Sequence, residues 1–284
     1  MSTPRTLETP AGVTARTVPT DRGAFALHEA AVPDGVTHRG HLLLIPGFTG
    51  SKEDFTPILP LLAAAGWHTC AYDQRGQFET PGDGAAYGLD DFAEDALALR
   101  EALWPYGPSA VVGHSFGGLV AQRAVLLDAS AWLGLTLLCS GPGGFTLPGV
   151  AEHAVDLEAR PKELRLFLQA VPVVGLKAVF DVQNADSTEP AEILAFLERR
   201  FLASDASSLC AIAEHLLDAE DRIDALAATG VPVAVVRGAD DDAWPHASQD
   251  AMAARLRTTV VVVPDAAHSP AVENPAATVA ALLG

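Results

Sequence analysis

Ser115 is the residue in this chain best placed to be a nucleophile. It lies in the pattern Gly113-His114-Ser115-Phe116-Gly117, after an apolar run at 109–112 and before a stretch, 118–127, that suits a helix. A strand, a sharp turn and a helix would form a nucleophile elbow, which exposes the serine hydroxyl at the end of the strand. Glycines suit such a turn because its backbone is strained and closely packed. An ordinary serine in a glycine-rich turn would also match this short pattern.

A serine hydroxyl becomes a strong nucleophile when a histidine takes its proton and a carboxylate orients that histidine. Residues 231–236 form a β-branched run that leads to three aspartates at 240–242, and residues 260–263 lead to His268. The carboxyl ends of parallel strands lie at one edge of a sheet, so an aspartate and His268 are expected near Ser115. Spacing alone does not choose among the three aspartates, and a surface-loop histidine would also fit position 268.

The elements that must position these groups alternate along the chain. Two short antiparallel strands are expected first, then buried β-branched or apolar strands separated by helices. This pattern predicts an α/β fold with a mostly parallel central sheet of about eight strands and helices on both faces. The expected strands are 14–18, 24–30, 41–45, 67–72, 110–112, 135–139, 231–236 and 260–263, and the expected helices are 54–65, 90–104, 246–256 and 276–283.

Residues 145–221 interrupt this alternation with helical patches at 152–170, 175–180, 190–202 and 207–217. We therefore expect a core of residues 1–144 and 222–284 with a helical cap, or lid, inserted at 145–221. The cap contains more apolar residues than one packed face needs, so some are expected either to pack on the core or to line an apolar pocket over Ser115. They are Leu164, Phe167, Leu168, Val173, Val174, Phe180, Phe196, Phe201, Leu209 and Leu216.

Composition limits the classes of partner. The formal net charge of −18 disfavours nucleic acid and anionic membranes as partners, because both carry phosphates. The three cysteines are far apart and fit buried free thiols of a reduced compartment. Residues 1–22 lack the apolar segment of a signal peptide, and no apolar run approaches the length of a membrane span. We therefore expect a cytoplasmic protein with no membrane span, and with no metal, because no Cys-x-x-Cys or histidine-rich motif is present.

Beyond these patterns, the chain resembles the α/β-hydrolase superfamily over residues 24–283. The resemblance rests on five motifs, with Pro46 and Ala267 where the family usually has histidine and glycine. The motifs are the turn Ile45-Pro46-Gly47-Phe48-Thr49-Gly50-Ser51; Asp73-Gln74-Arg75-Gly76; the elbow Gly113-His114-Ser115-Phe116-Gly117-Gly118; Gly238, Asp241 and Pro245; and Ala267-His268 followed by Glu273-Asn274-Pro275.

The resemblance implies a role for each matched position. Asp241 becomes the orienting acid, with Asp240 as the reserve candidate, and the backbone N–H groups of Phe48 and Phe116 become the oxyanion donors. His114 is expected to be structural, and Asp73 and Arg75 to stabilise loops. The substrate pocket is expected to include the side chains of Phe48, Phe116, Phe145, Phe180 and Trp244.

What the resemblance implies for function is a cofactor-free serine hydrolase that cleaves a small-molecule carboxylic ester or thioester with an apolar acyl group. Serine in place of aspartate at the elbow argues against haloalkane dehalogenase and epoxide hydrolase chemistry. Two other classes stay open: a cofactor-free lyase, perhydrolase or tailoring enzyme of secondary metabolism, and a ligand-binding protein on the same fold. The sequence does not decide whether the chain forms a homodimer.

Overall fold

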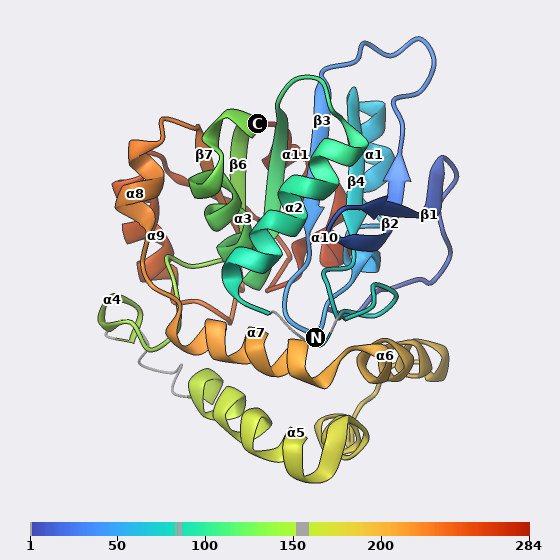
Figure 1. Ribbon diagram of the computed structural model, residues 1–284, viewed down its shortest axis with the longest axis vertical. Coiled ribbons are helices and arrows are strands. Elements are labelled where there is room, and N and C mark those ends of the chain that lie inside the picture. Colours follow the sequence, from blue (N-terminus) through green and yellow to red (C-terminus); the bar gives the residue numbers. More distant parts are fainter. Residues whose placement is uncertain (1, 83, 85–86, 152–158) are drawn as a thin grey trace.

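An eight-stranded, mostly parallel sheet forms the centre of the protein (Figure 1). The computed structural model describes residues 2–82, 84, 87–151 and 159–284. The strand order is β1-β2-β4-β3-β5-β6-β7-β8, with β1 and β2 antiparallel and β2 antiparallel to β4. The strands are β1 (Val13–Thr20), β2 (Gly23–Ala30), β3 (Gly40–Ile45), β4 (Trp67–Tyr72), β5 (Ser109–His114), β6 (Trp132–Leu138), β7 (Val233–Gly238) and β8 (Val260–Val263).

Helices cover both faces of the sheet, which confirms the predicted fold class. Successive residues of β3 enter opposite cores: Leu43 and Ile45 pack into the larger apolar cluster, and Leu42 and Leu44 into the smaller one. The larger core lies under α2 (Leu89–Leu103), α3 (Phe116–Leu127), α8 (Ile223–Ala228) and α9 (His246–Arg255). The smaller core lies under α1 (Leu59–Ala64), α10 (Pro270–Glu273) and α11 (Pro275–Leu283).

One helix boundary differs from the sequence prediction. A helix was expected over residues 54–65, but the structure has a 3-10 turn, η1 (Lys52–Asp54), and α1 begins only at Leu59. Pro57 and Pro60 lack the backbone N–H that a helix interior requires, so the regular helix can start only where the second proline occupies its first turn.

Between β6 and β7 the chain forms a group of helices at one end of the molecule (Figure 1). They are α4 (Pro148–Ala151), α5 (Ala159–Gln183), α6 (Ala191–Ala203) and α7 (Ala206–Asp218). Among the described residues of this insertion there is no strand. The helical patches expected at 175–180, 190–202 and 207–217 coincide with these helices, whereas residues 152–158 of the first expected patch lie outside the described residues.

The backbone of α5 bends sharply at Gly175, where φ is 77° and ψ is 169°. This bend leaves Val173 81% and Val174 56% exposed, so these two side chains point to the surface and not into a pocket. By length and composition Arg160–Gln183 would also pass for a membrane span, which corrects the expectation that no such run exists. Helices of water-soluble proteins pass the same test, so it is weak support for a span.

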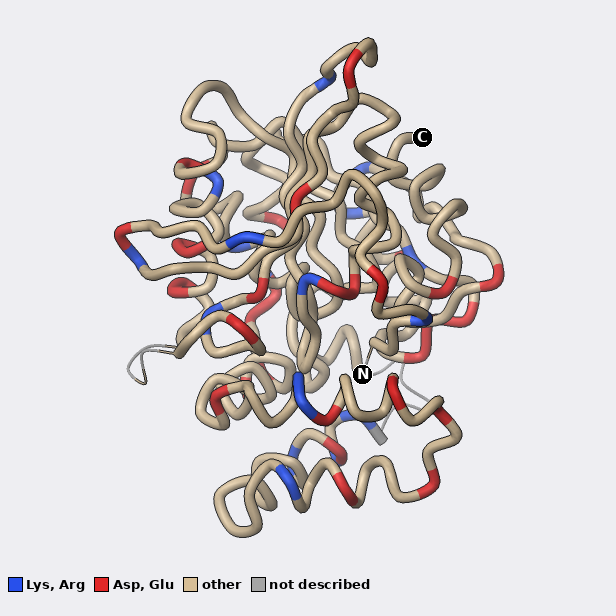
Figure 2. The backbone as a smooth tube through the Cα atoms, turned by 90° about the vertical axis from the view of Figure 1, so that its right-hand side faces the viewer, with Lys and Arg blue, Asp and Glu red and all other residues tan. Residues whose placement is uncertain are grey.

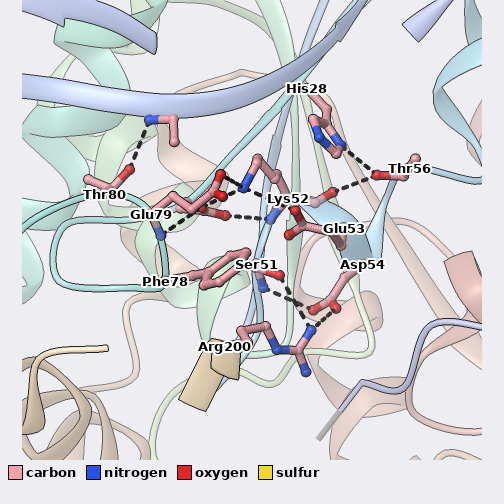
Figure 3. A network of polar contacts seen from close by, with 12 residues as sticks. His28, Ser51, Lys52, Glu53, Asp54, Thr56, Phe78, Glu79, Thr80 and Arg200 are labelled. Carbon is pink, nitrogen blue, oxygen red and sulfur yellow. Dashed lines mark hydrogen bonds and ion pairs between the residues drawn. The ribbon is translucent and has the colours of Figure 1, made fainter. Parts of the chain in front are cut away.

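A buried arginine joins the inserted helices to the core (Figure 3). Arg200 on α6 donates a hydrogen bond from Nη1 to Asp54 Oδ1 at 2.8 Å and from Nη2 to the carbonyl oxygen of Ser2 at 2.7 Å. Its side chain is fully buried, and burial also raises the pKa of Asp54, against the attraction of Arg200. Each of these charges can be buried only because the other is present. The ion pair therefore fixes α6 to the segment that follows β3.

Removing this pair is expected to destabilise the protein. Arg200→Met should lower the free energy of unfolding by about 3–5 kcal/mol, because Asp54 would remain buried without its partner. The double variant Arg200→Met/Asp54→Asn should recover part of that loss. Urea unfolding followed by circular dichroism measures both, with Arg199→Met, the exposed neighbour on α6, as the matched control. Equal losses in the single and double variants would contradict the role given to the buried charge.

Candidate active site

The turn between β5 and α3 holds Ser115 in a strained backbone conformation. Its φ is 54° and its ψ is −120°, a region that residues other than glycine rarely adopt. The backbone amide of Ser115 donates to the carbonyl oxygen of Leu138 at 2.9 Å, and Ser140 Oγ donates to the carbonyl oxygen of Ser115 at 2.8 Å. Both partners lie at the carboxyl end of β6, so β6 and the residues after it hold the turn in place.

Two glycines bring the turn against the end of β3. A Cβ atom at Gly117 would overlap the carbonyl oxygen of Ile45, so only glycine allows α3 to start so close to β3. A Cβ atom at Gly47 would lie 2.9 Å from the Cβ atom of Ser115. Ser115 is therefore in close contact with the segment after β3, and Phe48 and Phe116 directly follow the two contacting residues, Gly47 and Ser115.

The structure brings Ser115, His268 and Asp241 together in hydrogen-bonding order. His268 Nε2 lies 3.0 Å from Ser115 Oγ, and His268 Nδ1 lies 2.8 Å from Asp241 Oδ1. An ionised carboxylate can only accept, so Nδ1 carries the proton and Nε2 is left to accept one from the serine. Ser115 follows β5, Asp241 follows β7 and His268 follows β8, as the parallel topology predicts.

Asp241 is distinguished from its two neighbours by burial. It is 6% exposed, whereas Asp240 and Asp242 are exposed. Burial raises the pKa of Asp241, but hydrogen bonds from His268, the Ala243 amide and Gln249 Nε2 outweigh it and hold that pKa below its usual range. Asp241 is therefore a carboxylate at neutral pH and can stabilise a positive charge on His268.

Two buried glutamines fix the segment after β3, and sequence reasoning did not assign them. Gln74 Nε2 donates to the carbonyl oxygen of Pro46, and Gln77 Nε2 donates to the carbonyl oxygen of Gly47, both at 2.9 Å. The only sequence signal was the position of Gln74 inside the Asp-x-Arg-Gly motif. These bonds orient the peptide groups on either side of Gly47, and with them the amide of Phe48.

The charged residues of the same motif brace the surrounding loops. Asp73 accepts hydrogen bonds from the backbone amide of Lys52 at 2.7 Å and from Lys52 Nζ at 2.9 Å (Figure 3 shows Lys52 and its surroundings). Arg75 pairs with Asp95 on α2, with its Nε 2.6 Å from Asp95 Oδ2. The sequence expectation placed Asp73 and Arg75 in this supporting role, and neither lines the cavity next to Ser115.

A cavity of about 850 Å³ opens next to Ser115 and His268, between the core and the inserted helices. Its size is within the usual range for small-molecule sites. Its buried apolar wall comes from the insertion: Phe145, Leu164, Phe167, Leu197 and Leu216. Phe48, which is partly buried, adds to the wall from the core. Its exposed rim is acidic: Glu163, Asp186, Glu189 and Asp242 line it.

The aromatic wall differs from the sequence expectation at three positions. Phe48 and Phe145 line the cavity, but Phe116, Phe180 and Trp244 do not. Phe116 is fully buried and its ring packs in the core, 5.4 Å from the ring of Phe92. Phe180 packs on Phe201, and Trp244 lies behind Phe145 with their ring centres 4.5 Å apart. Phe116 and Phe180 thus pack on rings that do not line the cavity, whereas Trp244 packs on Phe145, which does line it.

The side chains around Ser115 are poorly suited to bind a metal ion. His268 contributes to two groups of nearby donors in the described residues, one with His114 and Cys139 and one with Asp241 and Asp242. Both ring nitrogens of His268 are already hydrogen-bonded, and burial raises the pKa of the Cys139 thiol, so the thiolate that a metal needs is disfavoured.

His114 holds the histidine loop in place. Its Nε2 donates to the carbonyl oxygen of His268 at 2.6 Å. Burial, and next the charge of His268, lower the pKa of His114 to about 3, so its ring is neutral at working pH. A neutral ring whose Nε2 is hydrogen-bonded to a backbone carbonyl oxygen fits the structural role expected for this residue.

This burial makes stability depend on pH. The unfolded chain protonates His114 near pH 6.5, whereas the folded chain does so near pH 3. Protonation of His114 therefore favours the unfolded state, so the free energy of unfolding is highest above pH 6.5 and decreases as the pH falls below it. Between pH 7 and pH 5 the wild type should lose about 2 kcal/mol of unfolding free energy more than His114→Gln, whose amide can still donate to His268. Urea unfolding at the two pH values measures the difference; identical pH dependence would contradict the assignment.

Comparison with known proteins places the chain in a family. The model of the alpha/beta hydrolase family matches residues 42–282. A non-heme chloroperoxidase from Streptomyces lividans is 25% identical over 221 residues, which are 74% of this chain and 77% of the relative. Epoxide hydrolase B from Mycobacterium tuberculosis is 28% identical over 163 residues, which are 54% of this chain and 43% of that protein.

Solved structures share the fold. A thermophilic esterase from Thermogutta terrifontis superimposes with a TM-score of 0.72 at 20% identity, covering 95% of this chain and 97% of the esterase. At that identity the likeness concerns the fold alone. The family match, however, spans the strands that carry Ser115, Asp241 and His268 and most of the described core. The chain belongs to the alpha/beta hydrolase family.

Proposed function

We propose that this protein hydrolyses carboxylic esters or thioesters with Ser115 as nucleophile, His268 as general base and acid, and Asp241 as the residue that orients His268. The observation that carries the proposal is the pair of contacts on one imidazole ring: Nε2 lies 3.0 Å from Ser115 Oγ and Nδ1 lies 2.8 Å from Asp241 Oδ1. Nucleophilic catalysis by serine needs this order of groups within hydrogen-bonding reach.

The reaction proceeds in two steps. Ser115 Oγ attacks the carbonyl carbon as its proton passes to His268 Nε2, and the resulting imidazolium protonates the leaving alcohol or thiol. Water then attacks the acyl-serine, again giving a proton to His268, and the collapse of the second tetrahedral intermediate releases the acid and restores Ser115. Asp241 stays ionised throughout and stabilises the transient charge on the ring.

The backbone amides of Phe48 and Phe116 are the proposed oxyanion donors. Phe116 is the first residue of α3, where amides lack partners within the helix. Phe48 lies in a turn, and among the described residues its amide donates no backbone hydrogen bond. Gln77, bonded to the carbonyl oxygen of Gly47, holds the Gly47–Phe48 peptide before substrate arrives.

The cavity also favours a substrate class. Its buried apolar wall suits an apolar acyl group or apolar leaving group. Its exposed rim has four carboxylates, and Arg160, the one Lys or Arg among the described lining residues, already pairs with Asp242 at 2.8 Å. Acidic residues also predominate over the whole chain (Figure 2). A neutral or cationic ester is therefore favoured over an anionic one, because the rim repels negative charge.

Ser115→Ala tests the nucleophile. The variant should lose at least about 1,000-fold in kcat towards p-nitrophenyl butyrate while keeping its melting temperature, since alanine has the same Cβ at the strained turn. Intact-mass analysis after treatment with a fluorophosphonate should show a single adduct on the wild type and none on the variant. Turnover retained by the variant would refute the assignment of Ser115. A folded wild type that forms no adduct would favour the ligand-binding alternative.

A pair of matched esters tests the acidic rim. We expect kcat/KM for a p-nitrophenyl ester with a terminal carboxylate on its acyl chain to be about tenfold or more below that of the neutral ester of equal length. The double variant Glu163→Gln/Asp242→Asn should reduce the difference in kcat/KM between the two esters. Asp34 is exposed and lies outside the cavity, so Asp34→Asn should leave that difference unchanged. Equal activity on both esters in the wild type would rule out selection by the rim.

The relative named as a non-heme chloroperoxidase favours one second candidate, a perhydrolase. Hydrogen peroxide in place of water would attack the same acyl-serine and release a peroxycarboxylic acid with a free Ser115. Both candidates need the same three residues, so only the product distinguishes them. Peracid formed from an ester and hydrogen peroxide faster than carboxylic acid is formed would favour the perhydrolase.

A further inference from the structure

Three histidines meet at the edge of the sheet opposite the candidate active site. His41 on β3 and His68 on β4 are direct partners in the parallel register, and His38 precedes His41 by three residues. One nitrogen of each ring lies within 4.8 Å of the nitrogens of the other two. His41 and His68 lie at the amino ends of β3 and β4, and His38 lies just before β3, whereas Phe48 and Ser115 follow carboxyl ends, so this cluster is separate from the ester site.

The surroundings hold two of these rings in place. His41 stacks on Trp104 with ring centres 4.8 Å apart and an interplanar angle of 22°, and the ring of His68 meets the same indole edge-on. His68 Nε2 lies 2.7 Å from Glu29 Oε1, and Glu29 in turn accepts from Arg16. The contact with Glu29 uses Nε2 of His68, so Nδ1 is the ring nitrogen left for another partner.

We propose that His38, His41 and His68 form a binding site for a divalent transition-metal ion of the Zn²⁺ type. Imidazole nitrogen is a preferred ligand of such ions, and three histidines with a water molecule complete a tetrahedral set. Glu29 supplies the outer hydrogen bond that commonly orients a ligating histidine. His38 is exposed in the segment before β3. Zn–N bonds of about 2.0–2.1 Å require the three nitrogens, now within 4.8 Å of one another, to draw together to about 3.4 Å.

The site departs from the expectation, made from the sequence, of no metal. His38 and His41 are three residues apart and His68 follows 27 residues after His41, a spacing that matches no common metal motif. Strand pairing alone brings them together. A bound ion would join the segment that carries His38 to β3 and β4 and would stabilise the fold at this edge, without taking part in the chemistry at Ser115.

Zn²⁺ titration of the full-length protein, freed of metal with a chelator, tests the site. Isothermal titration calorimetry should show one ion per chain, and Zn²⁺ at a hundredfold excess over its dissociation constant should raise the melting temperature by about 5 °C. His41→Gln should weaken binding at least about 100-fold. His38→Gln, at an exposed position that the fold does not depend on, should weaken it at least about tenfold.

His268→Gln is the matched control, because His268 belongs to both of the other candidate donor groups in the described residues. It should bind Zn²⁺ as tightly as the wild type. Three results would overturn the proposal: no binding to the wild type below millimolar Zn²⁺, undiminished binding in both His38→Gln and His41→Gln, or loss of binding in His268→Gln. The last result would place the ion at the ester site instead.

Discussion

The left-handed backbone at Ser115 is the constraint on which the rest of the site depends. Such a conformation costs on the order of 1–3 kcal/mol and persists only when its surroundings fix it. Here Leu138 at the end of β6 and Ser140 just after it supply the fixing hydrogen bonds, and Gly117 lets α3 start against β3. The central strands therefore determine where the hydroxyl points, and the loops after β7 and β8 need only bring Asp241 and His268 to it.

Much of this arrangement was accessible from the sequence because it depends on local patterns. Buried strands are continuous apolar runs, and parallel topology places their carboxyl ends at one edge, so His268 was expected near Ser115 from the order of the strands. Asp241 required the family resemblance, because three adjacent aspartates have the same local signal. Burial decides among them, and burial is a property of the folded chain.

The features that the sequence did not predict all depend on contacts between distant segments. Gln74 and Gln77 donate hydrogen bonds to carbonyl oxygens about 30 residues away in the sequence. The residues around a glutamine do not indicate so distant a partner. The direction of an aromatic ring is set by the neighbours it packs against, and Phe116 and Trp244 pack where they do not line the cavity. The three-histidine cluster likewise exists only through the register of β3 and β4.

The two sides of the cavity are held with unequal strength, and this bears on how molecules enter and leave. Detaching α6 would separate the buried ion pair of Arg200 and Asp54. The ion pairs described for α5, such as Arg160 with Asp242 and Lys177 with Glu198, are exposed and contribute little. Substrates and products are thus expected to reach and leave Ser115 past α5, whereas α6 stays fixed to the core.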